Sequence, residues 1–445
     1  MARKQKGKGI MRRGGWSKVV VATATAALAV PLGMTPAASA GTTAPSGNIT
    51  YFWWGDPIRN QLTDAVINLY EKAHPAVKVQ GEELAWTNYW EKVTVEAAAH
   101  TLPCVTQTQS RELETYTSGN VLMDLNSLVK SGEINVSGMP KAILNTGMVN
   151  GKLEMIPYGA AYDALVYNQS MVAKAGLPQP RRGWNYAQFG AWLKKLQAKL
   201  PKGVYATNLT GTDSDAFLIY AETHGYSLFN KAGQLGFPAS LLQDFWGIWE
   251  NYVKEGVAAP EAIYASEPTS SEESYIVKGR VAVEAEPGNQ YSDVVSAAAT
   301  SQVGKMGMML YPYGPHGLGE AIITSGLSIP AGCNNVSAAA SFINFFTNNA
   351  AAAKVFASNN GAVTDTALLN NQINSKATSP SVKLELSTYK YISGQHVPLV
   401  LYPSGYTQVF TDLFLQVSEK IFSGEESVAA GTKSFMQQAK VDLAS

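Results

Sequence analysis

The sequence predicts an α/β protein with an open parallel sheet, because strand-like and helix-like segments alternate from residue 49 onward with short connections between them. Residues 49–54 are apolar on both faces, as in a strand that helices cover on both sides. Apolar residues then recur at helical spacing until Pro75. A second strand at 77–79, a helix rich in aromatic residues and a third strand at 103–105 complete a βαβαβ order.

The end of the first predicted strand is where we expect a ligand. In open α/β sheets, ligands bind in the crevice beside the carboxyl ends of the strands. Trp53 and Trp54 stand at that end. The order of the elements therefore predicts a crevice with two tryptophans beside it.

Residues 1–40 have the pattern of an export signal. They carry seven basic residues and no acidic one, followed by an apolar run at 19–32 and the small-residue cleavage motif Ala38-Ser39-Ala40. We therefore expect an exported protein, in the periplasm or outside the cell. No cysteine lies near the cleavage motif, so we expect no lipid anchor of the usual kind.

The rest of the chain is acidic and large enough for two domains. The whole chain has 34 basic and 34 acidic residues, so without the seven basic residues of 1–40 there remain 27 against 34, a net charge near −7. That charge argues against nucleic-acid and anionic-membrane partners. Charged residues make up only 15% of the chain, which suggests acid tolerance, because a surface with few carboxylates loses fewer favourable interactions on protonation. Removing 40 of 445 residues leaves 405, more than one ordinary core holds.

Several segments resemble family 1 of the extracellular solute-binding proteins, the sugar-capturing components of ABC importers that include the maltose-binding proteins. The resemblance spans nearly all of residues 48–443. The segments that carry it are Tyr70-Glu71-Lys72-Ala73-His74-Pro75, the stretch 151–158 followed by Leu165-Val166-Tyr167-Asn168, Lys278-Gly279-Arg280-Val281-Ala282-Val283, and the helix-like 337–347.

The resemblance implies a two-lobed, periplasmic-binding-protein-like fold of type II, with three hinge crossovers and a ligand cleft between the lobes. It places the first part of lobe 1 at 41–158, the first part of lobe 2 at 159–320, a return to lobe 1 at 321–362 and the closing helices of lobe 2 at 363–445. A strand at 204–208 and another at 281–286 are expected in lobe 2.

The resemblance also implies the residues that contact a ligand. Aromatic faces suit sugars because the C–H faces of a sugar are apolar, whereas its hydroxyls need polar partners held in place. Asp213 can equally be only a helix cap, and Tyr162 only a core residue. The candidates for stacking are Trp53, Trp54, Trp86, Tyr291 and Tyr406, and those near the cleft for polar contacts are Asp56, Gln109, Tyr162, Asp213, Glu286 and Asn289.

Cys104 and Cys333 are the two cysteines of the chain. Export permits a disulfide. In the family that the chain resembles, the strand starting near 103 lies beside an antiparallel strand that returns near 326–329, so the resemblance implies that the two cysteines meet. The alternative is two separate thiols in the core.

Motifs of common enzyme classes are missing from the sequence. It contains no G-x-S-x-G, H-E-x-x-H or Walker pattern, and its five histidines have no metal-ligand spacing. We therefore expect no cofactor, no metal and no enzyme activity. A secreted carbohydrate-active enzyme remains an alternative, with Glu82-Glu83, or Glu284 with Glu286, as the imagined pair of acids.

The expected function is capture of a carbohydrate, an oligosaccharide rather than a monosaccharide, by a monomer that delivers it to ABC permease subunits in the membrane. A polyol or glycerol phosphate is the alternative ligand on the same scaffold. An anionic ligand would need a basic residue, and the candidate loops offer little apart from Arg59 and Arg111.

Overall fold

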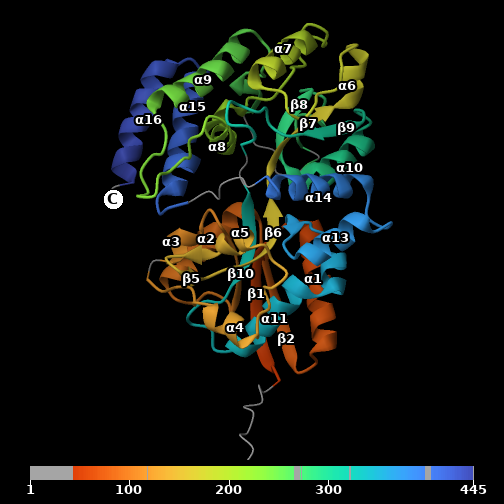
Figure 1. Ribbon diagram of the computed structural model, residues 1–445, viewed down its shortest axis with the longest axis vertical. Helices are drawn as coiled ribbons and strands as arrows, with labels where there is room; N and C mark the ends of the chain where they lie inside the picture. Colours follow the sequence, from red (N-terminus) through yellow and green to blue (C-terminus); the bar gives the residue numbers. More distant parts are fainter. Residues whose placement is uncertain are drawn as a thin grey trace, which may run out of the picture. The chain divides into compact units, whose positions relative to one another are not determined.

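The computed structural model describes residues 44–117, 119–264, 271, 273–319, 322–395 and 402–443. The predicted export signal at 1–40 lies outside these residues. The protein is built on two main sheets (Figure 1). One has six strands in the order β11-β6-β10-β3-β1-β2, and the other has three strands in the order β8-β7-β9. The part of the chain around the six-stranded sheet is lobe 1, and the part around the three-stranded sheet is lobe 2. The predicted two-lobed α/β fold is confirmed.

The six-stranded sheet begins with the predicted parallel strands. β1 pairs in parallel with β2 on one side and β3 on the other, whereas β10 is antiparallel to both β3 and β6. The third strand begins at Val105 rather than Pro103, since proline has no N–H to donate to a ladder. The strands are β1 (Gly47–Trp54), β2 (Val77–Leu84), β3 (Val105–Gln109), β6 (Ile156–Ala161), β10 (Ile323–Ser328) and β11 (Ala362–Val363), and β4 (Met148–Val149) pairs separately with β5 (Lys152–Leu153).

Helices cover both faces of β1, as its two apolar faces predicted. Tyr51 and Trp53 belong to a core with residues of α1 and α11, and Phe52 and Trp54 belong to a second core with residues of α2. The lobe 1 helices are α1 (Pro57–Ala73), α2 (Trp86–Ala98), α3 (Leu113–Thr117), α4 (Asn126–Ser131), α5 (Lys141–Asn145), α11 (Val336–Asn348) and α12 (Ala350–Phe356).

Lobe 2 contains a small antiparallel sheet and a large helical core. β7 lies between β8 and β9 and is antiparallel to both. Its elements are β7 (Asp163–Asn168), β8 (Val283–Pro287), β9 (Met306–Met309), α6 (Gln169–Lys174), α7 (Tyr186–Gln197), α8 (Ser214–Thr223), α9 (Ala239–Lys254), α10 (Tyr291–Ser301), α15 (Phe414–Phe422) and α16 (Val428–Asp442), with short 3₁₀ turns η1 (Thr210–Thr212), η2 (Glu261–Tyr264) and η3 (Gly288–Gln290) and the π-helical η4 (Thr407–Leu413).

The strand predicted at 204–208 is wrong. Tyr205 and Thr207 each make one isolated bridge, to Val281 and to Ala258. Because these two bridges go to different segments, no continuous ladder forms. The strand expected at 281–286 is present two residues later, as β8.

The chain passes between the two sheets at a shared core. β6 runs into β7 through Tyr162, and the segment after β11 leads to α13 (Thr366–Asn374) and α14 (Pro380–Ser393). α13 packs against α12 of lobe 1, and α14 packs against α10 of lobe 2. The sequence analysis placed the whole stretch 363–445 in lobe 2 and did not predict these two helices individually. The lobe boundaries at 158, 320 and 362 stay a proposal.

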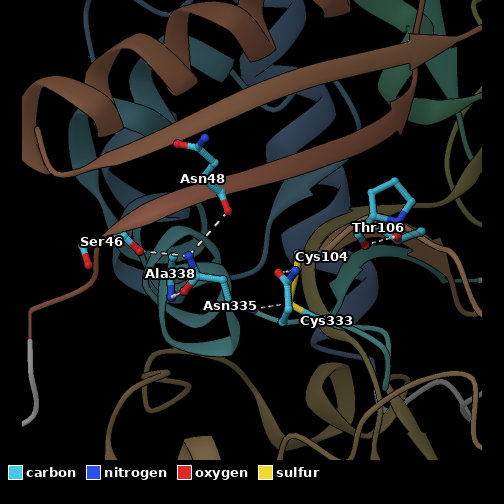
Figure 2. Close-up of a disulfide and its surroundings, with 9 residues drawn as sticks. Ser46, Asn48, Cys104, Thr106, Cys333, Asn335 and Ala338 are labelled. Atoms are coloured by element: carbon cyan, nitrogen blue, oxygen red, sulfur yellow. Dashed lines mark hydrogen bonds between the residues drawn. A yellow bond between two sulfur atoms is a disulfide. The ribbon is translucent and has the colours of Figure 1, made fainter.

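The expected disulfide between Cys104 and Cys333 is present and joins residues 229 apart in the sequence. It ties the segment before β3 to the loop before α11 (Figure 2). In that loop, the Asn335 amide Nδ2 donates to the carbonyl oxygen of Ser46 at 2.9 Å. The disulfide thus lies next to a contact that holds the start of β1.

No helix within the described part of the chain is both long enough and apolar enough to cross a membrane.

Candidate functional site

An aromatic cluster lies where β1 ends and α2 begins. Trp54 is the last residue of β1, and Trp86 is the first residue of α2. The Trp54 ring meets Trp86, Tyr89 and Trp90 at centroid distances between 5.1 and 5.5 Å. The Trp90 ring is stacked on Tyr116 at 5.7 Å. We call these five residues the aromatic cluster.

Within the aromatic cluster, Trp86 is the exposed residue and Trp90 is partly buried. It is 44% exposed, whereas Trp54 is 4% exposed. The indole N–H of Trp90 is buried and has no hydrogen-bond partner among the residues that the structure describes. The cluster therefore presents an aromatic surface at the carboxyl edge of the lobe 1 sheet, where ligands bind in open α/β sheets.

A charged centre joins the two lobes at the end of β3. Arg111 donates from Nη1 to Asp215 Oδ2 at 2.6 Å and from Nε to Gln109 Oε1 at 3.1 Å. Gln109 ends β3 of lobe 1, and Asp215 lies in the first turn of α8 in lobe 2. The hydroxyl of Tyr406 is hydrogen-bonded to Arg111 as well. We call Gln109, Arg111, Asp215 and Tyr406 the Arg111 centre.

Two further aspartates act electrostatically on the Arg111 centre. Burial, followed by repulsion from Asp215 and Asp213, raises the pKa of Asp163 well above its ordinary value. Burial, followed by repulsion from Asp215, raises the pKa of Asp213 to about 7, although backbone hydrogen bonds and Arg111 oppose the shift. Two of the carboxyls around Arg111 therefore bind protons much more tightly than an exposed aspartate does.

The polar candidates lie at element ends, and two of them act as helix caps. Asp56 accepts from the backbone N–H groups of Ile58 and Arg59 at the start of α1. Asp213 accepts from the N–H of Asp215 at the start of α8, so its capping role is real. Glu286 lies in β8 and Asn289 in η3, and burial followed by repulsion from Glu284 raises the pKa of Glu286 to about 8.

Three aromatic candidates are core residues. Trp53 is 1% exposed and donates to Asn60 Oδ1 at 3.0 Å. Tyr291 is 5% exposed, and its hydroxyl donates to the carbonyl oxygen of Met306 at 3.1 Å. Tyr162 is buried in the core between the sheets and donates to the carbonyl oxygen of Glu385 at 2.9 Å.

Side chains whose faces are covered cannot stack on a sugar. A ligand platform at Trp53 or Tyr291 is therefore not supported, and the core interpretation of Tyr162 is favoured.

Tyr406 is also buried, but it lies at the junction of the lobes. Its ring packs against Tyr402 at 4.8 Å and Phe410 at 5.9 Å. Its hydroxyl meets Arg111 and Ser214. The side chain therefore acts through its hydroxyl in the Arg111 centre rather than as a stacking face.

Sequence reasoning did not assign a role to Asp215, Trp90 or Tyr116. Arg111 was named only as a basic residue of the candidate loops. Trp86 and Trp90 are spaced i to i+4 in α2, which places both rings on one side of that helix. This spacing is visible in the sequence and could have identified Trp90 as a neighbour of Trp86.

No group of three or more histidine, cysteine, aspartate or glutamate side chains in the described residues could hold a metal ion. A cavity of about 440 Å³ lies beside Cys104 and is lined by Asn48, Thr50, Lys78 and Gln80, among others. These residues are near the amino ends of β1 and β2, away from the edge that carries the aromatic cluster.

Comparison with solved structures shows the same fold. An extracellular solute-binding protein of family 1 from Alicyclobacillus acidocaldarius is 25% identical, with a TM-score of 0.68 over 90% of this chain and 99% of that one. A substrate-binding protein of Listeria monocytogenes in complex with cycloalternan is 19% identical, with a TM-score of 0.77 over 90% and 99%. The GacH receptor of Streptomyces glaucescens, solved with acarbose, is 19% identical, with a TM-score of 0.75 over 90% and 99%.

Sequence comparison identifies the family. A binding protein of Brucella abortus is 22% identical over 201 residues, 44% of this chain and 47% of that protein. The chain thus spans about half the length of the curated relatives it matches. Residues 65–380, which are 316 of 445 residues, match the description of bacterial extracellular solute-binding proteins. This chain, as its resemblance predicted, belongs to the family of bacterial extracellular solute-binding proteins.

Proposed function

We propose that this protein is the exported substrate-binding component of an ABC importer, and that it binds a carbohydrate between its two lobes and delivers it to a membrane permease. The ligand is an oligosaccharide rather than a monosaccharide. The protein works as a monomer on the outer face of the cell membrane.

The observation that carries the proposal is the aromatic cluster with its exposed ring at Trp86. An exposed indole that packs against other aromatic side chains suits the apolar face of a sugar. The Arg111 centre adds hydrogen-bonding groups of the kind that sugar hydroxyls need. Proteins of the same fold solved with cycloalternan and with acarbose support a carbohydrate ligand.

An anionic ligand such as glycerol phosphate is disfavoured by the pairing of Arg111. Its guanidinium is already engaged by Asp215 and Gln109, and Asp163 and Asp213 lie close enough to affect its charge. A phosphate would have to share the guanidinium with the carboxylate of Asp215, and like charges at short range repel. A neutral polyol remains the alternative ligand.

The proposal includes no catalytic activity. Glu284, one of the two acids that could have formed a glycosidase pair, accepts hydrogen bonds from the backbone N–H groups of Tyr275 and Ile276. Those bonds give Glu284 a structural role in lobe 2. This weighs against a catalytic pair with Glu286.

A thermal-shift screen tests the proposal. Residues 41–445 would be heated with neutral mono-, di- and oligosaccharides, with polyols and with sugar phosphates. A ligand that binds the native state alone stabilises it by about 2.7 kcal/mol at a hundredfold excess over its Kd. We expect the largest shift with an oligosaccharide. Shifts with sugar phosphates only, or release of products from a sugar, would overturn the proposal.

A further inference from the structure

The turn after β3 holds two oppositely charged side chains at the junction of the lobes. The N–H of Ser110 donates to the carbonyl oxygen of Thr324 at 2.9 Å, and the N–H of Thr324 donates back to Ser110 Oγ at 3.1 Å. The N–H of Glu112 donates to the carbonyl oxygen of Gln109 at 3.1 Å. These bonds fix the backbone of lobe 1 on both sides of Arg111.

Both charged side chains of this turn contact lobe 2. Arg111 makes its 2.6 Å ion pair with Asp215, and the two side chains are only 24% and 14% exposed. The hydroxyl of Thr407 lies 3.1 and 3.0 Å from the two carboxylate oxygens of Glu112. One short turn of lobe 1 is thus held at two points by segments of lobe 2 that lie far apart in the sequence.

The two partners are themselves held firmly within lobe 2. Asp215 lies in the first turn of α8, and its N–H donates to the capping carboxylate of Asp213 at 2.9 Å. Thr407 is the first residue of the π-helix η4, which packs against α15 and α16. π-helical segments are rare and often occur at functional sites. Movement of either partner away from lobe 1 therefore requires movement of the lobe.

We propose that Arg111 and Glu112, with Asp215 and Thr407, form an interlobe latch that holds the lobes together before any ligand binds. Separation of the lobes would break the Arg111–Asp215 ion pair and the hydrogen bonds between Thr407 and Glu112 together. Both contacts form between side chains of the protein alone. The arrangement in which these contacts form therefore has stabilisation of its own, to which a ligand adds.

The latch sets how often the binding-competent state is populated. When only a fraction of the protein is competent, the apparent Kd equals the intrinsic Kd divided by that fraction. A tenfold fall in the closed fraction would thus weaken apparent affinity tenfold. The inference rests on the fold and on these contacts, and it does not depend on which ligand the protein takes.

Small-angle X-ray scattering of the ligand-free protein tests the latch. The variants are Asp215→Asn, which removes the charge at nearly constant volume, and Thr407→Val, which removes the hydroxyl, singly and together. The matched control is Glu255→Gln, which breaks the Lys194–Glu255 pair, also 2.6 Å long but contained within lobe 2. Far-UV circular dichroism and melting curves would verify that each variant is folded.

We expect the wild-type scattering to match the arrangement of the lobes in which both contacts form. The double variant should show a larger radius of gyration, and the control should match the wild type. A wild-type protein that is already open without ligand would overturn the latch. So would a folded double variant with the wild-type profile. If Asp215→Asn does not fold, the scattering profile of Thr407→Val alone decides. A profile equal to that of the wild type would then contradict the role of the contact between Thr407 and Glu112. Failure of every carbohydrate to bind would leave this result unaffected.

Discussion

Trp54 and Trp86 meet edge to face, with ring centroids 5.1 Å apart and an interplanar angle of 89°. The first ring is buried, and the second is the exposed member of the aromatic cluster. Trp54 packs against Tyr89 and Trp90, and its buried ring holds the Trp86 side chain in place. A side chain ordered before binding loses less conformational entropy when the ligand arrives.

Replacement of Trp86 tests whether this surface binds the ligand. Trp86→Ala should weaken carbohydrate binding roughly tenfold, because an aromatic contact is worth about 0.5–1.5 kcal/mol beyond the buried area. Isothermal titration calorimetry would measure the affinity. The control is Tyr226→Ala, an exposed aromatic residue just beyond the far end of α8, which should bind normally. Equal affinities in wild type and Trp86→Ala would count against the cluster.

Tyr291 should affect stability rather than binding. Tyr291→Phe removes the hydroxyl that donates to Met306 and leaves that carbonyl oxygen with one partner fewer. The expected cost is about 1 kcal/mol of unfolding free energy. Urea unfolding would measure it, and titration with the ligand should give an unchanged Kd. Loss of binding with normal stability would instead indicate that the Tyr291 hydroxyl contacts the ligand.

The disulfide should contribute strongly to stability. It closes a span of 229 residues, and bridges over long loops restrict the unfolded chain most. The double variant Cys104→Ser with Cys333→Ser should lose about 2–4 kcal/mol of unfolding free energy. A reductant should lower the melting temperature of the wild type and leave that of the double variant unchanged. If the wild type has the same melting temperature with and without reductant, the disulfide does not contribute to stability as expected.

Buried carboxyls should make the protein more stable in acid than in base. Burial raises the pKa of Glu385 to about 8, whereas the same group keeps a value near 4.5 when unfolded. Between these values the folded protein holds more protons than the unfolded chain, so the free energy of unfolding falls as pH rises. Glu154 and Asp213, each with a pKa raised to about 7 chiefly by burial, act in the same direction.

Urea unfolding at pH 5 and pH 8 would measure this effect. Each unit of pKa difference corresponds to about 1.4 kcal/mol. Glu385→Gln should reduce the loss of stability between the two pH values, because the amide does not titrate and can still accept from Ser292. The low fraction of charged residues predicted acid tolerance, and the raised pKa values of the buried carboxyls would be a second cause of it. Greater stability at pH 8 than at pH 5 would contradict both.

Lobe 1 was more predictable from the sequence than lobe 2. The segment 49–54 is apolar on both faces, and in the structure cores lie on both sides of β1. The segment 204–208 has similar local preferences for a strand, yet it makes only single bridges to two different segments. The local sequence does not determine whether a neighbouring strand has backbone N–H and C=O groups available for pairing.

The candidate site was predictable in position but not in its members. Trp53 and Trp54 are neighbours of one residue type, and both faces of β1 are covered, so the sequence could not tell which indole reaches the edge. Tyr291 was chosen for its ring, but that ring faces the lobe 2 core. Arg111 and Asp215 are 104 residues apart, and their contact depends on how the lobes meet.

A crystal structure with the oligosaccharide that gives the largest thermal shift tests the central claim most directly. The account predicts a sugar ring over the indole of Trp86 and sugar hydroxyls within hydrogen-bonding distance of the Arg111 centre, with both lobes in contact with the ligand. An oligosaccharide bound instead in the cavity beside Cys104, or held by one lobe alone, would contradict it.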